Sequence, residues 1–199
     1  MEQLQLIQDF FYKNNITIRV DGDYIRLIFA GEVVGQVYSS VGEYDVITAS
    51  MQTRSSELHA QNNVLNIHAL DILPTFGGRK YGTLLLIYCI LYRLIHNNLI
   101  QTAILDDMSA RSNYINNIYN SVGFAPTGLV SLMSKQQIGQ TGPEKQLDIN
   151  YFKNIYVNKI KEITSNGGGR NKRKTKRKSF YKKRSNTRNR RRSKYARKY

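Results

Sequence analysis

The first part of the chain switches between a helical and an extended pattern of apolar residues. One face of a helix over residues 3–13 carries the apolar residues Leu4, Ile7, Phe10 and Phe11. Asn14-Asn15 ends this helix. Apolar residues at a spacing of two then predict strands over 16–20, 24–29 and 33–38. The turns between them contain Gly22 and Gly31.

Residues 40–62 are mostly polar, and their pattern is weaker. We expect a brief strand at Val46-Ile47 and either a loop or a weak helix over residues 55–61. This part of the chain contributes little to the predicted core.

The middle of the chain has the clearest order of elements. Residues 64–73 are rich in β-forming residues and end at Pro74. An apolar helix without Gly or Pro is predicted over 83–96, and a further strand over 100–105. A strand, a helix and a strand in this order predict two parallel strands joined by a helical crossover.

The last elements are marked by helix caps. Asp106, Asp107 and Ser109 are candidate N-caps for a helix over residues 110–121, which Gly123 closes. A strand is predicted over 129–133. The polar residues 135–147 show no strand pattern. From Asp148 a last amphipathic helix carries the apolar residues Phe152, Ile155, Tyr156, Ile160 and Ile163.

The predicted order is therefore α-β-β-β-β-α-β-α-β-α. The fold class is α/β in its α+β form, because hairpins precede the strand-helix-strand unit. The central sheet should be mixed and mostly antiparallel.

Charge divides the chain into two parts. The net charge is +16, yet residues 167–199 hold 17 of the 30 basic residues and no acidic one. We therefore predict a near-neutral globular domain over 1–166 and a disordered Lys/Arg-rich tail over 167–199, beginning at three glycines. Basic runs bind polyphosphates by releasing counterions, so nucleic acid is the expected partner of residues 170–199.

Several classes of protein are disfavoured by composition. Cys89 is the single cysteine, which excludes an intramolecular disulfide framework and fits a reducing compartment. The longest apolar run, residues 84–92, is less than half of the ~20 residues that span a bilayer. The three histidines have no metal-site spacing, so no metal is expected. We expect a soluble intracellular protein.

A glycine-rich turn joins the strand over 64–73 to the apolar helix. It reads Thr75-Phe76-Gly77-Gly78-Arg79-Lys80-Tyr81-Gly82. The N-terminus of a helix offers unpaired amides and a partial positive charge, which suit a phosphate group. The spacing fits neither a Walker loop nor a dinucleotide fingerprint. From the residues alone, a tight turn without a ligand is the favoured interpretation.

This segment resembles the GNAT superfamily of acetyl-CoA-dependent N-acetyltransferases. In that family a strand ends in a bulge, and a [Q/R]-x-x-G-x-[G/A] turn then binds the diphosphate of the coenzyme. Gly77 stands at the Gln/Arg position, Lys80 at the first glycine and Gly82 at the last position. The resemblance implies a coenzyme A site made by residues Leu73, Gly77, Gly78, Arg79, Lys80, Tyr81, Gly82 and Thr83, with acetyl-CoA as co-substrate. The Lys80 side chain would crowd the diphosphate or, pointing outward, pair with it.

A second segment resembles the same family. After a later strand the family has a helix with an Asn, followed by Tyr-x-x-x-Gly-Phe. Here Asn113 precedes Tyr119-Asn120-Ser121-Val122-Gly123-Phe124. The resemblance implies that Asn113 belongs to the coenzyme site and that Tyr119 is the general acid that protonates the leaving thiolate. A packed or surface tyrosine is the alternative.

The general base is expected on the strand before the turn. Strict alternation places Asn66, His68 and Leu70 on one face of this strand. Some arylalkylamine-type relatives carry histidines there, and the ordinary pKa of histidine suits neutral pH. His68 is therefore the candidate base and Asp71 the weaker alternative. A hydrogen-bonded structural histidine is the other interpretation of His68. The glutamate of histone-type relatives is replaced by Asn66.

Two functions from different classes remain open. The first is an N-acetyltransferase that transfers an acetyl group to a primary amine of an unknown acceptor. The second is an inactive GNAT-like scaffold that binds nucleic acid or joins a virion through its basic tail. Gly-rich hinges leading into such tails resemble, in composition, those of proteins of large DNA viruses. The nucleus, a viral factory and a virion are the compartments that fit this hypothesis.

Overall fold

The computed structural model describes residues 1–49, 56–107, 117–130 and 143–165. Four helices, one short 3-10 helix and seven strands lie in these ranges. Along the chain they are α1 (Glu2–Lys13), β1 (Ile16–Asp21), β2 (Tyr24–Phe29), β3 (Glu32–Ala49), β4 (Ser56–Ile72), η1 (Pro74–Phe76), α2 (Tyr81–His96), β5 (Thr102–Asp106), α3 (Ile118–Val122), β6 (Ala125–Val130), β7 (Pro143–Asp148) and α4 (Ile149–Ser165).

The described strands form one mixed sheet in the order β1-β2-β3-β4-β5-β7-β6. Only β4 and β5 run parallel, and every other neighbouring pair is antiparallel. The parallel pair is joined through α2, as the strand-helix-strand order predicted. The predicted fold class, an α+β fold with a mixed and mostly antiparallel sheet, is confirmed.

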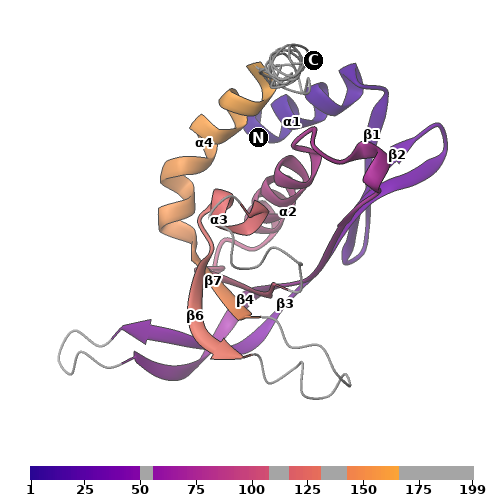
Figure 1. Cartoon of the computed structure of the whole chain (residues 1–199). Helices are drawn as coiled ribbons and strands as arrows, with labels where there is room; N and C mark the ends of the chain where they lie inside the picture. Colours follow the sequence, from indigo (N-terminus) through magenta and orange to yellow (C-terminus); the bar gives the residue numbers. More distant parts are fainter. Residues whose placement is uncertain (50–55, 108–116, 131–142, 166–199) are drawn as a thin grey trace, which may run out of the picture. The chain divides into compact units, whose positions relative to one another are not determined.

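Helix α2 is the centre of the core. Its residues Tyr81–Leu91 are all buried, because its apolar residues cover the whole circumference rather than one stripe. It contacts α1, α3 and α4 as well as strands β2, β3 and β4. Figure 1 shows α1, α2 and α4 close together, with the long strands β3 and β4 extending away from them. The helices thus pack over one face of the sheet.

Strands β3 and β4 are longer than the sequence pattern indicates. The weak helix or loop expected over residues 55–61 is wrong, because β4 begins at Ser56 and pairs with β3 from Ala49 onward. Cross-strand pairing over this length stabilises segments that alone carry few strand signals.

The second half of the chain also differs from the prediction. Strand β7 lies in the segment where no strand was expected, and β6 begins at Ala125, before the strand expected over 129–133, of which residues 131–133 lie outside the described residues. Helix α3 begins after the N-cap Asn117, whose extended backbone interrupts the expected helix over 110–121. Asp107 is a buried partner of Lys145, and residues 108–116, which include the helix start that it was expected to cap, lie outside the described residues.

The remaining predicted helices and strands are present close to their expected bounds. Asp148 caps α4 as expected, since its Oδ1 accepts hydrogen bonds from the amides of Asn150 and Tyr151. Within the described ranges, no helix has the length and apolar character needed to cross a membrane. The basic tail and its junction at residue 166 lie outside the described residues, so both stay predictions.

Candidate active site

Strands β4 and β5 separate in the middle of the sheet. They pair at three positions, the last of which joins Ile67 to Leu105. In the described part of the chain, residues 68–72 of β4 have no pairing partner on β5, although residues 69–72 stay paired with β3. The two parallel strands therefore diverge toward their carboxyl ends, next to the start of α2.

A bulge in β4 lies at the point of separation. Tyr38 of β3 pairs with Ala69, and the next residue, Ser39, pairs with Ile67. His68 is therefore the extra residue of the bulge. A bulge bends its strand and increases the local twist, which accounts for the divergence of β4 from β5. The bulge that the GNAT resemblance predicts near the end of this strand is present.

The bulge also corrects the predicted faces of β4. Strict alternation placed Leu70 on the face of His68, and this is wrong. Ile67 is in the main core and Leu70 packs against the same core. The extra residue at position 68 shifts the alternation by one, so Leu70 returns to the face covered by the helices.

The turn after β4 holds two residues in the left-handed conformation. Gly78 has a φ of 75° and Lys80 a φ of 64°. Lys80 is the N-cap of α2, and no side chain caps the helix there. The first amides of α2 therefore have no capping acceptor from a side chain, as an anion-binding helix start requires. A non-glycine residue at a left-handed N-cap is a strained choice, which explains why glycine is usual there.

The predicted coenzyme residues fall into two groups. Leu73, Gly77, Gly78, Arg79 and Lys80 are exposed, whereas Tyr81, Gly82 and Thr83 are buried. The ring of Tyr81 packs against Phe10, Phe11 and Phe76, so its side chain belongs to the core. Only its backbone amide remains to bind a ligand. The side chain of Lys80 is exposed to solvent. Asn113 lies outside the described residues.

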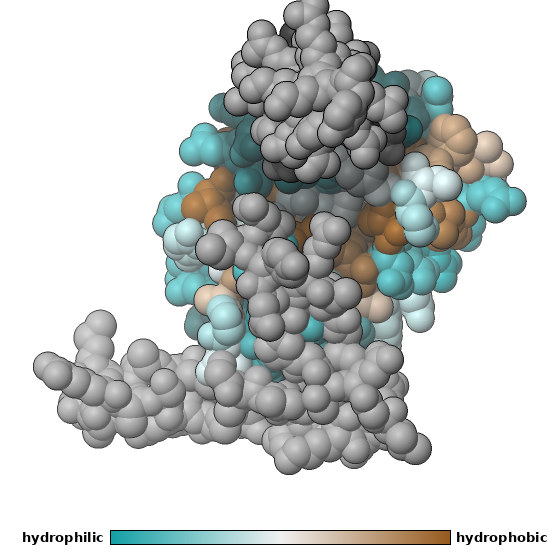
Figure 2. Space-filling model, in the orientation of Figure 1, coloured by the Kyte–Doolittle hydropathy of each residue, from teal (hydrophilic) through white to brown (hydrophobic). Residues whose placement is uncertain are grey.

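Apolar and cationic groups border the turn. The guanidinium carbon of Arg79 lies 5.9 Å from the ring centroid of Phe76, and the ring of Phe29 lies 5.3 Å from that same ring. Leu73 is exposed beside them. The face in Figure 2 carries hydrophobic surface (brown) between hydrophilic regions (teal). A ligand with both a phosphate and an apolar part would find both kinds of contact at this turn.

Gly82 is a point of close approach at the start of α2. A Cβ atom there would lie 3.1 Å from Cδ1 of Ile118 and 3.4 Å from Cγ1 of Ile72. The end of β4 and the start of α3 therefore both come against the first turn of α2. This contact sets the distance between the Gly-rich turn at residues 75–82 and the helix that carries Tyr119.

Tyr119 lies near the carboxyl ends of both diverging strands. Its ring packs edge-on against Phe124, and Asn117 Oδ1 accepts a hydrogen bond from its amide. Burial, with smaller contributions from the carboxylates of Asp107 and Asp71, raises the pKa of the Tyr119 phenol to about 12. Asp107 follows β5 and Asp71 ends β4, so the phenol lies within electrostatic range of both. It is protonated at neutral pH.

His68 takes part in a short chain of hydrogen bonds. Its Nε2 lies 2.7 Å from Oγ of Ser40, which lies 3.2 Å from the hydroxyl of Tyr44. Its ring stacks on Tyr38 at 4.7 Å. Partial burial lowers the pKa of His68, and the carboxylates of Asp23 and Asp106 counteract part of this decrease. The imidazole is therefore mostly neutral near pH 7.

His68 and Tyr119 are on opposite faces of the sheet. Ser39 faces α2, because it accepts hydrogen bonds from Cys89 and Arg93 of that helix. Its neighbour Ser40, which contacts His68, faces the other way. Tyr119 packs against the core on the helical side. No direct contact between the two is seen, and both flank the opening between β4 and β5.

A buried polar network supports α3 and was missed by sequence reasoning. Lys145 Nζ lies 2.6 Å from Oδ2 of Asp107, and their side chains are 1% and 0% exposed. Lys145 also donates to Oδ1 of Asn120 at 2.9 Å, and Asn117 Nδ2 donates to Asp107. Lys145 stands in a polar segment that gave no signal of burial. Ser40 was missed for the same reason.

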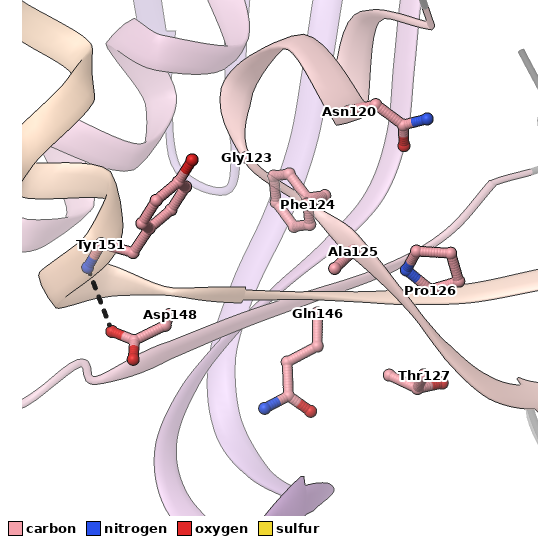
Figure 3. A pocket seen from close by; sticks show the side chains of 9 residues that line it. All are labelled: Asn120, Gly123, Phe124, Ala125, Pro126, Thr127, Gln146, Asp148 and Tyr151. Atoms are coloured by element: carbon pink, nitrogen blue, oxygen red, sulfur yellow. Dashed lines mark hydrogen bonds between the residues drawn. The ribbon is translucent and has the colours of Figure 1, made fainter. Parts of the chain in front are cut away.

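The described residues also line a pocket formed by α3, β6, β7 and the start of α4. It has a volume of about 610 Å³ and is lined by Asn120, Gly123, Phe124, Ala125, Pro126, Thr127, Gln146, Asp148 and Tyr151. Figure 3 shows that Tyr151 and Asp148 border it at the start of α4, with Pro126 and Thr127 on β6 at the other side. None of the predicted site residues lines this pocket. Within the described ranges, no cluster of three or more metal-binding side chains occurs.

The comparisons with known proteins give structural likenesses only. No protein-family model matches the sequence, and no curated protein matches it. The chain resembles AtaTR bound to acetyl-CoA, at 11% identity and a TM-score of 0.47, over 73% of this chain and 77% of the other. It also resembles a proposed GNAT acetyltransferase from Desulfovibrio desulfuricans (9% identity, TM-score 0.44, 63% and 68% covered). A third likeness is to the loading GNATL domain of CurA from Lyngbya majuscula, at 14% identity and a TM-score of 0.43, over 75% of this chain and 93% of the other. At such identities a likeness concerns the course of the chain and assigns no activity.

Proposed function

We propose that the protein is an N-acetyltransferase that uses acetyl-CoA as co-substrate and a primary amine as acceptor. The observation that carries this proposal is the separation of β4 from β5 at His68, with the uncapped start of α2 beside it and Tyr119 near both strand ends. A thioester bound where the two strands separate would lie between the two proposed proton-transfer groups. The identity of the acceptor is left open.

The turn and the first amides of α2 would bind the diphosphate of the coenzyme. The uncapped amides supply hydrogen-bond donors, the helix dipole adds partial positive charge, and the exposed Lys80 and Arg79 supply two cations. The buried side chain of Tyr81 would not take part. Acetyl-CoA itself supplies the acyl group and a thiolate leaving group.

The reaction would be a direct transfer without a covalent enzyme intermediate. The amine nitrogen attacks the thioester carbonyl, and a C–N bond forms while the C–S bond breaks. Neutral His68 accepts the proton that the amine loses, either directly or through a water. The phenol of Tyr119 gives its proton to the sulfur of the leaving thiolate. The products are the amide and the free thiol. His68 then loses its proton to solvent, and Tyr119 regains one from solvent.

The binding step is the first test of this proposal. Isothermal titration of the full chain with acetyl-CoA should give one site with saturable heat at millimolar coenzyme or below. The control ligand is desulfo-coenzyme A, which keeps the diphosphate and should bind with an affinity similar to that of acetyl-CoA. Absence of binding at millimolar concentrations would contradict the enzyme hypothesis.

A second function is favoured by the charge of the tail. With 17 basic residues among 33, residues 167–199 would bind nucleic acid with little sequence preference. This function would stand alone if the domain is inactive, or would bring an active enzyme to its substrates. Binding of a DNA duplex should weaken steeply with salt. Replacing the six basic residues of 172–178 by glutamine should reduce the slope of the logarithm of the binding constant against the logarithm of the salt concentration. An unchanged slope would exclude this part of the tail from the binding of nucleic acid.

A further inference from the structure

The ion pair between Lys145 and Asp107 links the strand ends to the helix that carries Tyr119. Lys145 is on β7, where it lies opposite Leu105 of β5, and Asp107 comes directly after β5. Both side chains are fully enclosed. An ammonium group at such a place costs desolvation energy, so its retention calls for a role beyond simple packing.

The pair holds α3 at two positions that flank Tyr119. Asp107 accepts a hydrogen bond from Nδ2 of Asn117, the N-cap of α3. The Oδ1 of the same Asn117 accepts the amide of Tyr119 at 2.7 Å. Lys145 donates to Oδ1 of Asn120, on the other side of Tyr119. The ammonium also lies 6.0 Å from the ring centroid of Tyr119.

We propose that Lys145, acting through Asp107, Asn117 and Asn120, is a positioning residue that holds the phenol of Tyr119 at the opening between β4 and β5. The part of this proposal that concerns catalysis rests on the proposed acetyl transfer. A five-residue helix cannot fix a side chain by itself, and its attachment to two separate strands through one buried ion pair gives it a defined place.

The pair also controls the charge near the phenol. The charged groups near Tyr119 in the described residues are Asp71 on β4, Asp107 after β5 and Lys145 on β7. The two carboxylates oppose ionisation of the phenol, whereas Lys145 compensates the charge of Asp107 at 2.6 Å. Removal of the ammonium alone should therefore make the phenol harder to ionise, and removal of both charges of the pair should reverse this effect.

Fluorine NMR of the full chain with 3-fluorotyrosine at position 119 tests the proposal without requiring activity. Fluorination lowers the pKa of a phenol into an accessible range. In Lys145→Met the proton affinity of this residue should rise by about tenfold, the effect of one charge in a partly buried site. In the double variant Asp107→Asn/Lys145→Met it should fall back to the native value or below. Lys159→Met, which removes a surface ion pair with Glu162, should leave the titration unchanged.

The kinetic readout separates positioning from binding. If acetyl transfer is present, Lys145→Met should lower kcat by about tenfold or more and change the KM for acetyl-CoA by less than about twofold. The double variant leaves no buried charge unpaired. If Lys145→Met does not fold, the kinetic test is therefore made with the double variant. A native kcat in the double variant would overturn the proposal. Identical fluorotyrosine titrations in the native, single and double variants, with native circular dichroism, would overturn it as well. A chain without any acetyl transfer would contradict the proposed function, and the titration would still decide the role of Lys145.

Discussion

Nε2 of His68 and Oγ of Ser40 lie 2.7 Å apart, next to the point where β3 and β4 lose register. If Nε2 donates this hydrogen bond, the Nδ1 lone pair is left to accept a proton, and Ser40 can donate onward to Tyr44. Ser40 would thus select the tautomer that a base needs. The pH dependence of the proposed reaction should therefore depend on both His68 and Ser40.

We predict that kcat/KM falls on the acid side with a pKa below the usual 6.5 of histidine, because burial lowers the pKa of His68. The free energy of unfolding should also decrease toward acid pH. The unfolded chain binds the proton more readily, so the free energy of unfolding should decrease as the pH falls from 6.5 through the folded pKa. His68→Gln should remove the acid limb. In Ser40→Ala the pKa of the acid limb should shift and kcat/KM should decrease. An identical acid limb in the native protein, His68→Gln and Ser40→Ala would exclude His68 as the base.

Tyr119→Phe should lower kcat by roughly 10²- to 10⁴-fold, the usual contribution of a general acid. The phenol has a pKa of about 12 and is a proton donor over the whole neutral range, so no alkaline limb from this group is expected near pH 8. Binding of acetyl-CoA should be almost unchanged. The matched control is Tyr12→Phe on α1, where the side chain is 74% exposed. Equal rates for the two variants would assign Tyr119 a packing role.

Lys80→Met should weaken acetyl-CoA binding by about 3- to 10-fold, since it removes one exposed cation at the diphosphate position. Methionine keeps the unbranched side chain and the left-handed backbone at a φ of 64°. The difference between the variant and the native protein should shrink in high salt. Lys153→Met on α4 serves as a control with the same charge change. Tighter binding by Lys80→Met would show that the lysine crowds the coenzyme.

Gly123→Ala should destabilise the fold by roughly 2–4 kcal/mol, because it adds a steric clash to an unfavourable backbone. Its φ is 108°, and a Cβ would lie 2.9 Å from Cε1 of Tyr151 and 3.2 Å from Cδ1 of Leu147. Gly22→Ala isolates the backbone cost at about 1 kcal/mol, since nothing lies within 4 Å of its Cβ position. Urea unfolding measures both. Equal losses would mean that α4 moves away to accept the methyl group.

Local patterns predicted the helices and the strand-helix-strand order well. The all-apolar stretch of α2 and the cap at Asp148 are determined by neighbouring residues, so the sequence contains them directly. Strand β7 and the outer parts of β3 and β4 depend on pairing with distant segments. Their residues are mostly polar, and Val46-Ile47 of β3 is the part for which the sequence pattern predicted a strand.

The sequence named candidate site residues, but it contained only part of their geometry. The Gly-rich turn, Tyr119 and a bulge near the end of the strand follow from the motif resemblance, whereas the position of the bulge at His68 does not, because a bulge changes the register without changing composition. The burial of Lys145 is set by Asp107, which is 38 residues away in sequence. Such a pair is recognised only once the fold brings β5 and β7 together.

The central claim is that the start of α2, beside the opening between β4 and β5, binds the diphosphate of acetyl-CoA. Amide chemical shifts of the full chain during titration with acetyl-CoA test it most directly. The account predicts that the largest changes occur at Gly78 and at residues 80–83, together with Tyr119. Saturating changes confined to the pocket around Gly123 and Tyr151, or no change at millimolar coenzyme, would contradict it.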